Sequence, residues 1–329
     1  MFLRSLFFLL VLSEAVQFCI LPESPEFCTT VENGVSLRDL IAYSLQAVHD
    51  GGVILRETRN QKNLQITAKS DSSPVTFADE ESNRRITSYF ERNFAAVAVI
   101  SEEATQTSAS RFRPRSKPFR RYERAARKLL PTDVPLNSSS LTIWVDPLDA
   151  TREYIQGLTE YTTVMIGIAI DGIPIAGIIH KPFLVETVLG VNLPGFRTAA
   201  HIIGKNVVLD SISHSAPKKV MHSRSHVNQE DVEIVLNEKY GFDSNDFEYM
   251  AAGGSGYKSL ELVHGRAMYY IHPSNIKLWD LCAPAAILAA TGGALLDLEL
   301  NEINFSKDQN PLHEKGVFAV FSKQKTFVN

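Results

Sequence analysis

The sequence predicts an α/β protein with two lobes, an α+β lobe followed by an α/β lobe. In residues 36–188, helical patterns come first and strand-rich segments with a hairpin signal follow, whereas helical and strand patterns alternate in residues 189–329. Separate runs of helices and strands are typical of α+β structure, and alternation is typical of α/β structure. Four proline and glycine residues between positions 182 and 195 predict the boundary between the lobes near residues 183–195.

Composition excludes several classes of protein. Of the 329 residues, 44% are hydrophobic and 21% are charged, which is ordinary for a globular chain. The net charge of -4 argues against a nucleic-acid polymer as partner, because binding a phosphate backbone needs a basic face. Three cysteines, Cys19, Cys28 and Cys282, are too few for a disulfide framework, and no Cys/His motif indicates zinc. Whether Cys28 and Cys282 pair stays open.

Residues 1–21 have the pattern of a signal peptide or a signal anchor. One arginine precedes seven consecutive apolar residues, 6–12, and a small-x-small cleavage pattern follows at residues 13–15. A seven-residue helix is only about 10 Å long, short of the roughly 30 Å of a bilayer core. This length favours a cleaved leader, with membrane contact only if the segment is kept as a type II anchor. Either form predicts the secretory lumen, where the sequons at Asn137 and Asn304 would meet glycosylation.

Two helices and a short strand are predicted at the start of the first lobe. Ser36, with Asp39 three residues later, resembles a capping box. Apolar residues at helical spacing follow until Gly51-Gly52 interrupts the pattern. A second helix is expected at about residues 80–94 and a strand at residues 97–100.

Residues 111–128 form a basic segment with nine Arg or Lys residues and one Glu. Charge runs are usually solvated, so a loop or an insertion is expected here. A basic rim that attracts a polyanionic substrate is the alternative, and proteolytic processing at the basic pairs is a third interpretation.

Turn residues and periodicity predict the remaining elements. A buried strand at residues 141–145 stops at Asp146, and two strand-like segments, 162–170 and 173–179, flank the hairpin signal Asp171-Gly172. In the second lobe the predicted elements are a helix at 231–236, a glycine turn at 253–256 leading into a helix through Leu262, a strand at 267–271, a helix at 278–290 ended by Gly292, and a strand at 294–298.

The octapeptide WVDPLDAT at residues 144–151 predicts a cation site. A hydrophobic strand delivers Asp146 to its end, the following proline turns the chain, and Asp149 points back toward Asp146. Such a carboxylate pair suits Mg²⁺, which prefers oxygen ligands and keeps waters for a substrate phosphate. The Leu148 carbonyl can add a ligand, and N–H groups of a helix starting at Ala150-Thr151 would face an anion. The alternative is a capped turn with Asp149 as N-cap.

Other acidic residues stand at the ends of predicted elements. Glu102 and Glu103 end a strand, Asp79 opens a helix, and Asp280 lies beside a tryptophan at the start of an apolar helix. Each alone is typical of a surface residue or a helix cap. Together with the two aspartates of the octapeptide, they lie where open α/β folds bind ligands.

These strings carry a family resemblance. Ser101-Glu102-Glu103, the octapeptide at residues 144–151 and Leu278-Trp279-Asp280, in this order, resemble the inositol monophosphatase superfamily of Mg²⁺-dependent, lithium-sensitive phosphatases. The resemblance covers roughly residues 36–321. It implies an αβαβα layered sandwich of the inositol monophosphatase and fructose-1,6-bisphosphatase type, with the active site between the lobes. It also implies two or three Mg²⁺ ions, Li⁺ as an inhibitor and a homodimer.

Finer features resemble one branch of that superfamily. The segments SRSH at residues 223–226, GGSGYK at 253–258 and HKPF at 180–183 are similar to the 3′(2′),5′-bisphosphate nucleotidases. The string DPLDAT, with the secretory N-terminus, resembles the Golgi members of the branch. Ala150 stands where the wider family has glycine, which costs about 1 kcal/mol if φ there is positive.

The resemblance assigns roles residue by residue. The implied metal ligands are Glu102, Asp146 and the Leu148 carbonyl for one Mg²⁺, Asp146, Asp149 and Asp280 for a second, and Glu103 for a weaker third ion or an outer-shell water. Thr151 and Asp79 would form a hydrogen-bonded pair that orients and helps deprotonate the attacking water. The implied substrate contacts are the N–H groups of Ala150 and Thr151, with Ser223, His226, Gly254, Lys258 and the Asp280 region.

The implied activity is hydrolysis of the 3′-phosphate of a small nucleotide, adenosine 3′,5′-bisphosphate, to AMP and phosphate. In the secretory lumen, and in the Golgi above all, this would support sulfation by clearing a product of sulfotransferases. An inositol monophosphate phosphatase with the same metal chemistry is the alternative. A catalytically silent, metal-binding secreted protein is a remote one, since every implied ligand position is intact.

Overall fold

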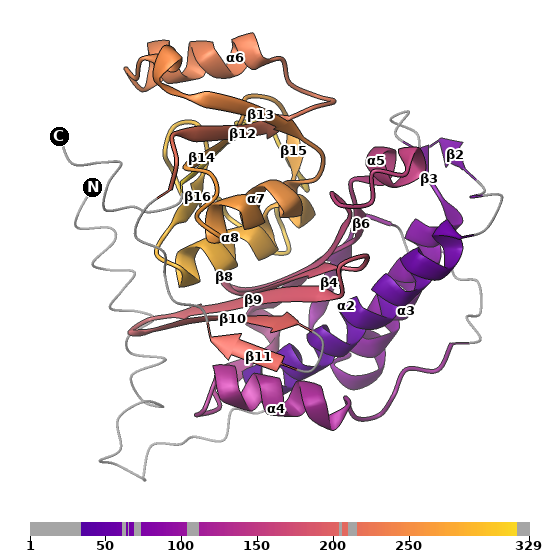
Figure 1. The fold of residues 1–329 in the computed structure, drawn as a ribbon. Helices are drawn as coiled ribbons and strands as arrows, with labels where there is room; N and C mark the ends of the chain where they lie inside the picture. The colour runs from indigo at the N-terminus through magenta and orange to yellow at the C-terminus, as the bar shows by residue number, and fades with distance from the viewer. Residues whose placement is uncertain are drawn as a thin grey trace.

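The computed structural model describes residues 34–60, 64, 66–68, 74–103, 112–203, 206–209 and 216–320. In this part of the chain the elements stack in five layers: three helices, a seven-stranded sheet, two helices, a five-stranded sheet and an outer helix (Figure 1). This is the αβαβα order that the resemblance implies, and it confirms the α/β fold class. The predicted signal segment, Cys19 and Cys28 lie outside the described residues. Among those described, no helix combines the length and hydropathy that crossing a membrane would need.

The first helical layer begins with α2, Leu37–Arg59, whose N-cap Ser36 accepts a hydrogen bond from the Asp39 N–H at 3.0 Å. The predicted interruption at Gly51-Gly52 is wrong, because the helix continues through both glycines. A Cβ on Gly51 would lie 2.7 Å from the Ser82 hydroxyl, and one on Gly52 would lie 2.7 Å from the His180 ring. The glycines therefore permit close packing and do not end the helix.

The second helix, α3, spans Phe77–Asn93 and starts earlier than predicted. Its N-cap Thr76 and its third residue, Asp79, form a reciprocal capping box. Farther along α3, the Ser82 hydroxyl donates to the Pro147 carbonyl at 2.8 Å. These contacts attach the start of α3 to the octapeptide that carries the predicted metal ligands.

The basic segment is only partly the predicted loop. Residues 112–119 are irregular, but residues from Arg120 form helix α4, Arg120–Leu129. One side of α4 is buried, through Tyr122, Ala125, Ala126 and Leu129. The loop prediction is wrong there because these apolar residues recur at helical spacing between the charged ones.

The large sheet has the order β11-β10-β9-β8-β7-β6-β4. Its strands are β4, Ala98–Ser101; β6, Leu141–Asp149; β7, Thr163–Ile170; β8, Ile173–Lys181; β9, Glu186–Leu193; β10, Phe196–Ile203; and β11, Asn206–Leu209. Only β4 and β6 pair in parallel. The predicted hairpin is confirmed, with φ of 47° at Asp171 and 84° at Gly172. The predicted boundary near 183–195 is wrong, because β9 and β10 continue this sheet and the second sheet begins only at Lys219.

The middle layer consists of α7, Ser255–Val263, and α8, Cys282–Ala290, and it packs between the two sheets (Figure 1). Strands β7 and β8 approach α8 closely, since a Cβ on Gly177 would lie 2.3 Å from the Ala283 carbonyl oxygen. Cys282 is buried here and forms no disulfide with any residue that the structure describes.

The second sheet has the order β13-β12-β14-β18-β16 and mixes parallel and antiparallel pairs. Its strands are β12, Lys219–Ser223; β13, Glu248–Ala252; β14, Tyr269–His272; β16, Ala294–Leu296; and β18, Val317–Val320. Helix α6, Gln229–Ile234, continues as a π-turn through Lys239 and covers the outer face. The smaller elements are β1, Gly34–Ser36; β2, Thr67–Ala68; β3, Pro74–Val75; β5, Pro135–Asn137; α5, Thr151–Gln156; β15, Ile276–Lys277; β17, Leu312–His313; and 3-10 turns at Ser138–Ser140, Ser244–Asp246 and Leu278–Asp280.

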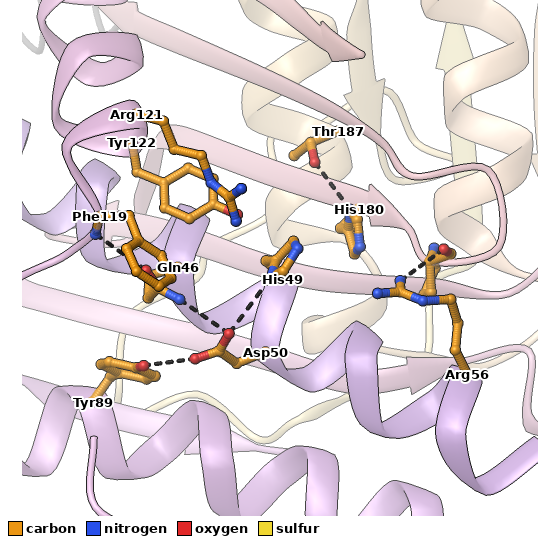
Figure 2. A network of polar contacts seen from close by, with 11 residues as sticks. Gln46, His49, Asp50, Arg56, Tyr89, Phe119, Arg121, Tyr122, His180 and Thr187 are labelled. Atoms are coloured by element: carbon orange, nitrogen blue, oxygen red, sulfur yellow. Dashed lines mark hydrogen bonds and ion pairs between the residues drawn. The ribbon is translucent and has the colours of Figure 1, made fainter. Parts of the chain in front are cut away.

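A polar network joins α2 to its neighbours (Figure 2). Asp50 accepts hydrogen bonds from Tyr89 at 2.6 Å and Gln46 at 3.0 Å, and its carboxylate also lies 3.4 Å from His49 Nδ1. Burial raises the pKa of Asp50, but these hydrogen bonds outweigh it and hold the pKa below its ordinary value. The fold therefore supplies this carboxylate with its own donors.

Candidate active site

A pocket of about 270 Å³ opens at the end of β6. The predicted site residues that line it are Glu102, Asp146, Leu148, Asp149, Ala150, Thr151, Ser223, His226, Gly254, Lys258 and Asp280. Asp79 does not line the pocket but is hydrogen-bonded to Thr151, which does. Glu103 lines a neighbouring hollow. Segments separated by almost two hundred positions thus meet in one place.

Strand β6 carries the first two carboxylates farther than predicted. It does not stop at Asp146 but runs to Asp149, with a shift of register between them, and Asp149 pairs with Thr163 of β7. Both aspartates are buried. The Leu148 N–H donates to Asp146 Oδ1 at 3.1 Å, which fixes this carboxylate against the turn.

Asp149 is held by the start of α7. Its carboxylate accepts the Ser255 N–H at 3.2 Å, the Gly256 N–H at 2.8 Å and the Thr163 hydroxyl at 2.9 Å. Gly254 has φ of 67°, and a Cβ there would lie 2.7 Å from Asp149 Oδ2. The absence of a side chain at Gly254 therefore allows the start of α7 to approach this carboxylate.

Asp280 completes a group of three. One oxygen each from Asp146, Asp149 and Asp280 lies within 4.8 Å of the others. Asp280 ends the 3-10 turn before α8, where its carboxylate accepts the Lys277 N–H at 3.3 Å and its carbonyl accepts the Ser255 hydroxyl at 2.8 Å. The third carboxylate is thus tied to the loop that holds Asp149.

These carboxylates carry more negative charge than their surroundings balance. Burial, and then the charges of Asp149 and Glu102, raises the pKa of Asp280 to about 8. Burial and the same kind of repulsion raise the pKa of Asp146 well above its ordinary value. The pKa of Asp149 is also raised by burial, although Lys258 and three hydrogen bonds oppose this. Clustered carboxylates of this kind are stable as anions when a cation lies between them.

The donor set fits a hard divalent cation. Carboxylate and carbonyl oxygens are the ligands that Mg²⁺ takes in proteins, and the pocket offers three aspartates, Glu102 and the Leu148 carbonyl. Glu102 is fixed in place because its N–H donates to the Val145 carbonyl at 3.1 Å. These residues could hold a metal ion.

The predicted pair of Thr151 and Asp79 is hydrogen-bonded. The Thr151 hydroxyl lies 3.0 Å from Asp79 Oδ1 and 3.1 Å from the Leu148 carbonyl. Asp79 Oδ2 accepts the Thr76 hydroxyl at 2.6 Å and the Thr76 N–H at 2.7 Å. Burial raises the pKa of Asp79 to about 7, with the hydrogen bonds from Thr76 opposing it. Asp79 is therefore a positioned carboxyl that titrates near neutral pH.

Glu103 is not part of the pocket lining. Its carbonyl accepts the Asn83 side-chain amide at 2.8 Å, and the residue lines a separate hollow beside α3 and β4 with Thr87 and Phe90. The charges of Glu102 and Glu103 both raise the pKa of Asp79, so the Glu103 carboxylate is close enough to act on the site although it does not line the pocket.

Ala150 has a left-handed backbone, with φ of 69° and ψ of 47°. Because φ is positive, alanine at this position costs about 1 kcal/mol relative to the glycine of the wider family. The strained residue precedes Thr151, the first residue of α5. The angle turns the chain from β6 into the helix that carries the Thr151 hydroxyl.

The predicted substrate residues Ser223, His226 and Lys258 also line the pocket. Ser223 Oγ accepts the His226 N–H at 3.2 Å, so this serine stabilises its own turn while lining the pocket. Burial lowers the pKa of His226, with Arg152 and Lys258 adding to the effect. The Lys258 ammonium is buried, donates to the Gly254 carbonyl and lies 5.0 Å from the centre of the Tyr270 ring. Burial lowers its pKa to about 8.

Sequence patterns missed several residues of the site. Thr163 and Ser255 hold Asp149, and Arg152, Lys277 and Tyr270 line the pocket. Arg152 and Lys277 adjoin the predicted motifs and could have been found from that proximity. Thr163 belongs to an apolar strand with no motif, so only the pairing of β6 and β7 reveals it.

Known proteins resemble this chain over nearly its whole length. A model of the inositol monophosphatase family matches residues 36–324. Inositol monophosphatase 3 of Xenopus laevis is 32% identical over 87% of this chain and 79% of its own length. The Golgi-resident adenosine 3′,5′-bisphosphate 3′-phosphatase of Mus musculus is 32% identical over 83% of this chain and 75% of its own length.

A solved structure shares the fold. CysQ from Bacteroides thetaiotaomicron, described as a bacterial member of the inositol monophosphatase family, superposes with a TM-score of 0.63 at 19% identity, covering 86% of this chain and 97% of that one. This likeness concerns the layered architecture alone. The match to the family model and the identity to its members show that the chain is a phosphatase and belongs to the inositol monophosphatase family.

Proposed function

We propose that the protein is a Mg²⁺-dependent phosphatase that removes the 3′-phosphate of adenosine 3′,5′-bisphosphate in the secretory lumen. One observation carries the proposal: three mutually repelling aspartates share a pocket with the Thr151 hydroxyl, which is hydrogen-bonded to Asp79. A cation site beside a positioned hydroxyl is the arrangement that phosphomonoester hydrolysis needs.

Asp146, Asp149, Asp280, Glu102 and the Leu148 carbonyl are the residues that would hold Mg²⁺. When bound, Mg²⁺ would neutralise the carboxylates, lower the pKa of a water molecule and offset charge on the transferred phosphoryl group. Glu103 does not line this pocket, and its proposed role remains contact with a weaker third ion or an outer-shell water.

Thr151 and Asp79 position the attacking water. A hydroxyl has one hydrogen, and when Thr151 donates it to Asp79 Oδ1 at 3.0 Å its lone pairs are free to accept a hydrogen bond from water. Asp79, with a pKa of about 7, can accept a proton from the Thr151 hydroxyl along this hydrogen bond near neutral pH. The threonine alone would be a poor base, so its effect depends on the aspartate behind it.

The rest of the pocket suits a nucleotide with two phosphates. Arg152, Lys258 and Lys277 line it and offer positive charge to phosphate oxygens. Ile276 and Trp279 add apolar surface on which a purine can stack. The name of the mouse relative supports the same substrate.

Hydrolysis of inositol monophosphate is the second candidate, because other relatives at similar identity are named inositol monophosphatase 3. Inositol monophosphate offers no base to stack on Trp279 and no second phosphate for the cationic side chains that line the pocket. The nucleotide therefore uses more of the pocket.

A substrate panel separates the two. Phosphate release from adenosine 3′,5′-bisphosphate and from inositol 1-phosphate is compared at equal concentrations with Mg²⁺. The expected kcat/KM favours the nucleotide at least tenfold, and a tenfold preference for the inositol ester would reject the proposed substrate. Trp279→Ala is expected to raise KM for the nucleotide while leaving hydrolysis of a small aryl phosphate unchanged.

Location has its own test. The sequence pattern of residues 1–21 and the Golgi-resident name of the mouse and rat relatives support a luminal protein. Asn137 and Asn304 are both exposed, so both sequons are accessible to glycosylation. N-terminal sequencing of the mature protein distinguishes a cleaved leader from a kept anchor, and a shift in mass on glycosidase treatment tests the luminal location. An unglycosylated protein in the cytosolic fraction would contradict it.

A further inference from the structure

A second cluster of metal-ligating side chains lies away from the pocket. It comprises Glu186 on β9, His201 on β10 and His264, which follows the last residue of α7. Glu186 pairs with Ile203 across the two strands, so Glu186 and His201 are diagonal neighbours on one face of the sheet. The same face bears Gly190, which packs against α8, so the cluster lies between the sheet and the middle helical layer.

The distances suit a tetrahedral ion. His201 Nδ1 lies 3.5 Å and His264 Nε2 lies 3.8 Å from the same oxygen, Glu186 Oε1. One ligand atom from each of the three residues lies within 4.8 Å of the others. Ligand atoms at zinc–ligand distances of about 2.0–2.1 Å are about 3.4 Å apart in a tetrahedron. Movements of a few tenths of an ångström would bring each of the two ring nitrogens to this distance from Glu186 Oε1.

His264 has unused ligand capacity. Neither of its ring nitrogens has a hydrogen-bond partner among the described residues, and both are shielded from solvent. Its side chain is 11% exposed. Leaving buried polar atoms without partners costs about 1–3 kcal/mol, so an imidazole that stays in this state is expected to serve a ligand.

The protonation states agree with metal binding. Burial lowers the pKa of His264 to about 4, so its ring is neutral with a free lone pair at neutral pH. The hydrogen bond from His201 lowers the pKa of Glu186, which is therefore a carboxylate. To bind a metal through Nδ1, His201 would give up this hydrogen bond and carry its proton on Nε2. Metal ions bind these deprotonated forms.

Two cations near the cluster have other partners. Arg266 donates to Glu261 at 3.0 and 2.5 Å, and the Lys181 ammonium lies 4.9 Å from the centre of the Tyr257 ring. Lys181 also lies opposite Glu186 across β8 and β9, and its charge contributes to the lowered pKa of Glu186. A metal ion would therefore share this carboxylate with a nearby ammonium group.

We propose that Glu186, His201 and His264 bind one Zn²⁺ ion or a similar borderline divalent transition metal, with a fourth position open to water. Two imidazoles and one carboxylate are zinc ligands, whereas the all-oxygen aspartate group suits Mg²⁺. The ion would join β9 and β10 to the end of α7, whose other end holds Asp149. The site has no sequence motif because its ligands come from three distant segments.

Zn²⁺ binding to the intact chain tests this site. The protein is stripped with chelator, given millimolar Mg²⁺ to fill the aspartate group, and titrated with Zn²⁺ against a chromophoric competitor. We expect one equivalent bound per chain, with affinity at least tenfold weaker in His264→Gln and in the nearly isosteric Glu186→Gln. Controls are His313→Gln, a half-buried histidine elsewhere, and Asp146→Asn in the aspartate group; both should bind as the parent does.

Two results would overturn the proposal. One is affinity that is equal in the parent and both cluster variants, or no saturable binding at all. The other is loss of zinc in Asp146→Asn with retention in His264→Gln, which would assign the zinc to the aspartate group. X-ray absorption at the zinc edge gives an independent readout, since two imidazole ligands are expected in the parent and one in His264→Gln. Circular dichroism of the metal-free variants identifies any that fail to fold, and Glu186→Gln then serves as the remaining test.

Discussion

Asp50 and Asp280 are two carboxylates that the same fold treats in opposite ways. Asp50 receives donors from Tyr89, Gln46 and His49, and its pKa is lowered. Asp280 lies beside two other aspartates, and its pKa is raised to about 8. The first carboxylate is satisfied by the chain itself, and its network stabilises the layer of α2. The second lies in a group of carboxylates that could hold a cation and that destabilises the fold while its charges repel one another.

The largest expected effect comes from breaking the unsatisfied group. Asp146→Asn removes the charge of one of the three clustered aspartates and is expected to lower kcat/KM at least about 10³-fold, since the loss of several kcal/mol of transition-state stabilisation is involved. In chelator, its thermal midpoint should equal or exceed that of the parent, because a repelling charge is gone. Phosphate release and thermal unfolding measure the two quantities, and unchanged activity would place the chemistry elsewhere.

The next effect concerns the hydroxyl that adjoins this group. Thr151→Val keeps the shape but removes the donor to Asp79, and kcat should fall about 10²-fold, the scale of a lost general base. Thr151→Ser keeps the hydroxyl and should retain most activity. Equal kcat in the valine and serine variants would show that the hydroxyl does not act on the water.

Breaking the satisfied network should affect stability and not catalysis. Asp50→Ala leaves the Tyr89 hydroxyl and the Gln46 amide without their acceptor and should cost about 1–3 kcal/mol of unfolding free energy. Asp50→Asn, which keeps one oxygen, should cost less. Denaturant unfolding measures both, with kcat/KM expected within twofold of the parent. A greater loss of activity than of stability would contradict the contrast between the two carboxylates.

The pH dependence of metal-free stability follows from the raised pKa values. Between 3.8 and about 8 the folded chain keeps a proton on Asp280 that the unfolded chain has lost, so the unfolding free energy falls as pH rises through this window. Asp79, at about 7, acts in the same direction. Buried His180 and His264 act oppositely, but only below about 6.5, and Lys258 acts oppositely only above about 8.

A window from pH 6.5 to 8 therefore isolates the carboxylates. In EDTA the thermal midpoint should be a few degrees lower at pH 8 than at pH 6.5, as expected for a change of about 1 kcal/mol. Saturating Mg²⁺ should reduce this difference, since the cation replaces the proton. A thermal midpoint in EDTA that rises from pH 6.5 to pH 8 would contradict the raised pKa values of Asp280 and Asp79.

The smallest effect concerns the strained residue Ala150, which lies between Asp149 and Thr151. Ala150→Gly relieves about 1 kcal/mol of left-handed strain and adds freedom to the unfolded chain, so a net gain of about 0.5 kcal/mol in stability is expected. Gly157→Ala, at φ of 87° at the end of the same helix, is the matched control and should destabilise. Loss of stability in Ala150→Gly would mean that the angle is not the strained one.

Local patterns and the family resemblance built on them predicted the acidic residues that line the pocket, because each lies in a contiguous string. Asp146 and Asp149 end a hydrophobic strand, and Asp280 and Glu102 stand beside other recognisable residues. The strings do not say what holds each ligand. That Thr163 and the start of α7 bind Asp149 depends on contacts across distant segments, which no window of sequence contains.

The fold class could be read from the order of patterns, but the lobe boundary could not. Pro182, Pro194 and Gly195 lie in turns of the large sheet, since antiparallel strands also need tight connections, and Gly190 lies within β9 where it packs against α8. Gly51 and Gly52 predicted a helix interruption, but they lie inside α2 and permit its close packing. In both cases the residue type signals a local backbone or packing need, and only tertiary contact shows which.

The most direct test of the account is removal and return of the cation with adenosine 3′,5′-bisphosphate as substrate. Treatment with chelator should abolish phosphate release, Mg²⁺ should restore it in the parent, and the same Mg²⁺ should restore little in Asp146→Asn. Phosphate release that persists in chelator would contradict the claim that these aspartates act by holding a metal ion.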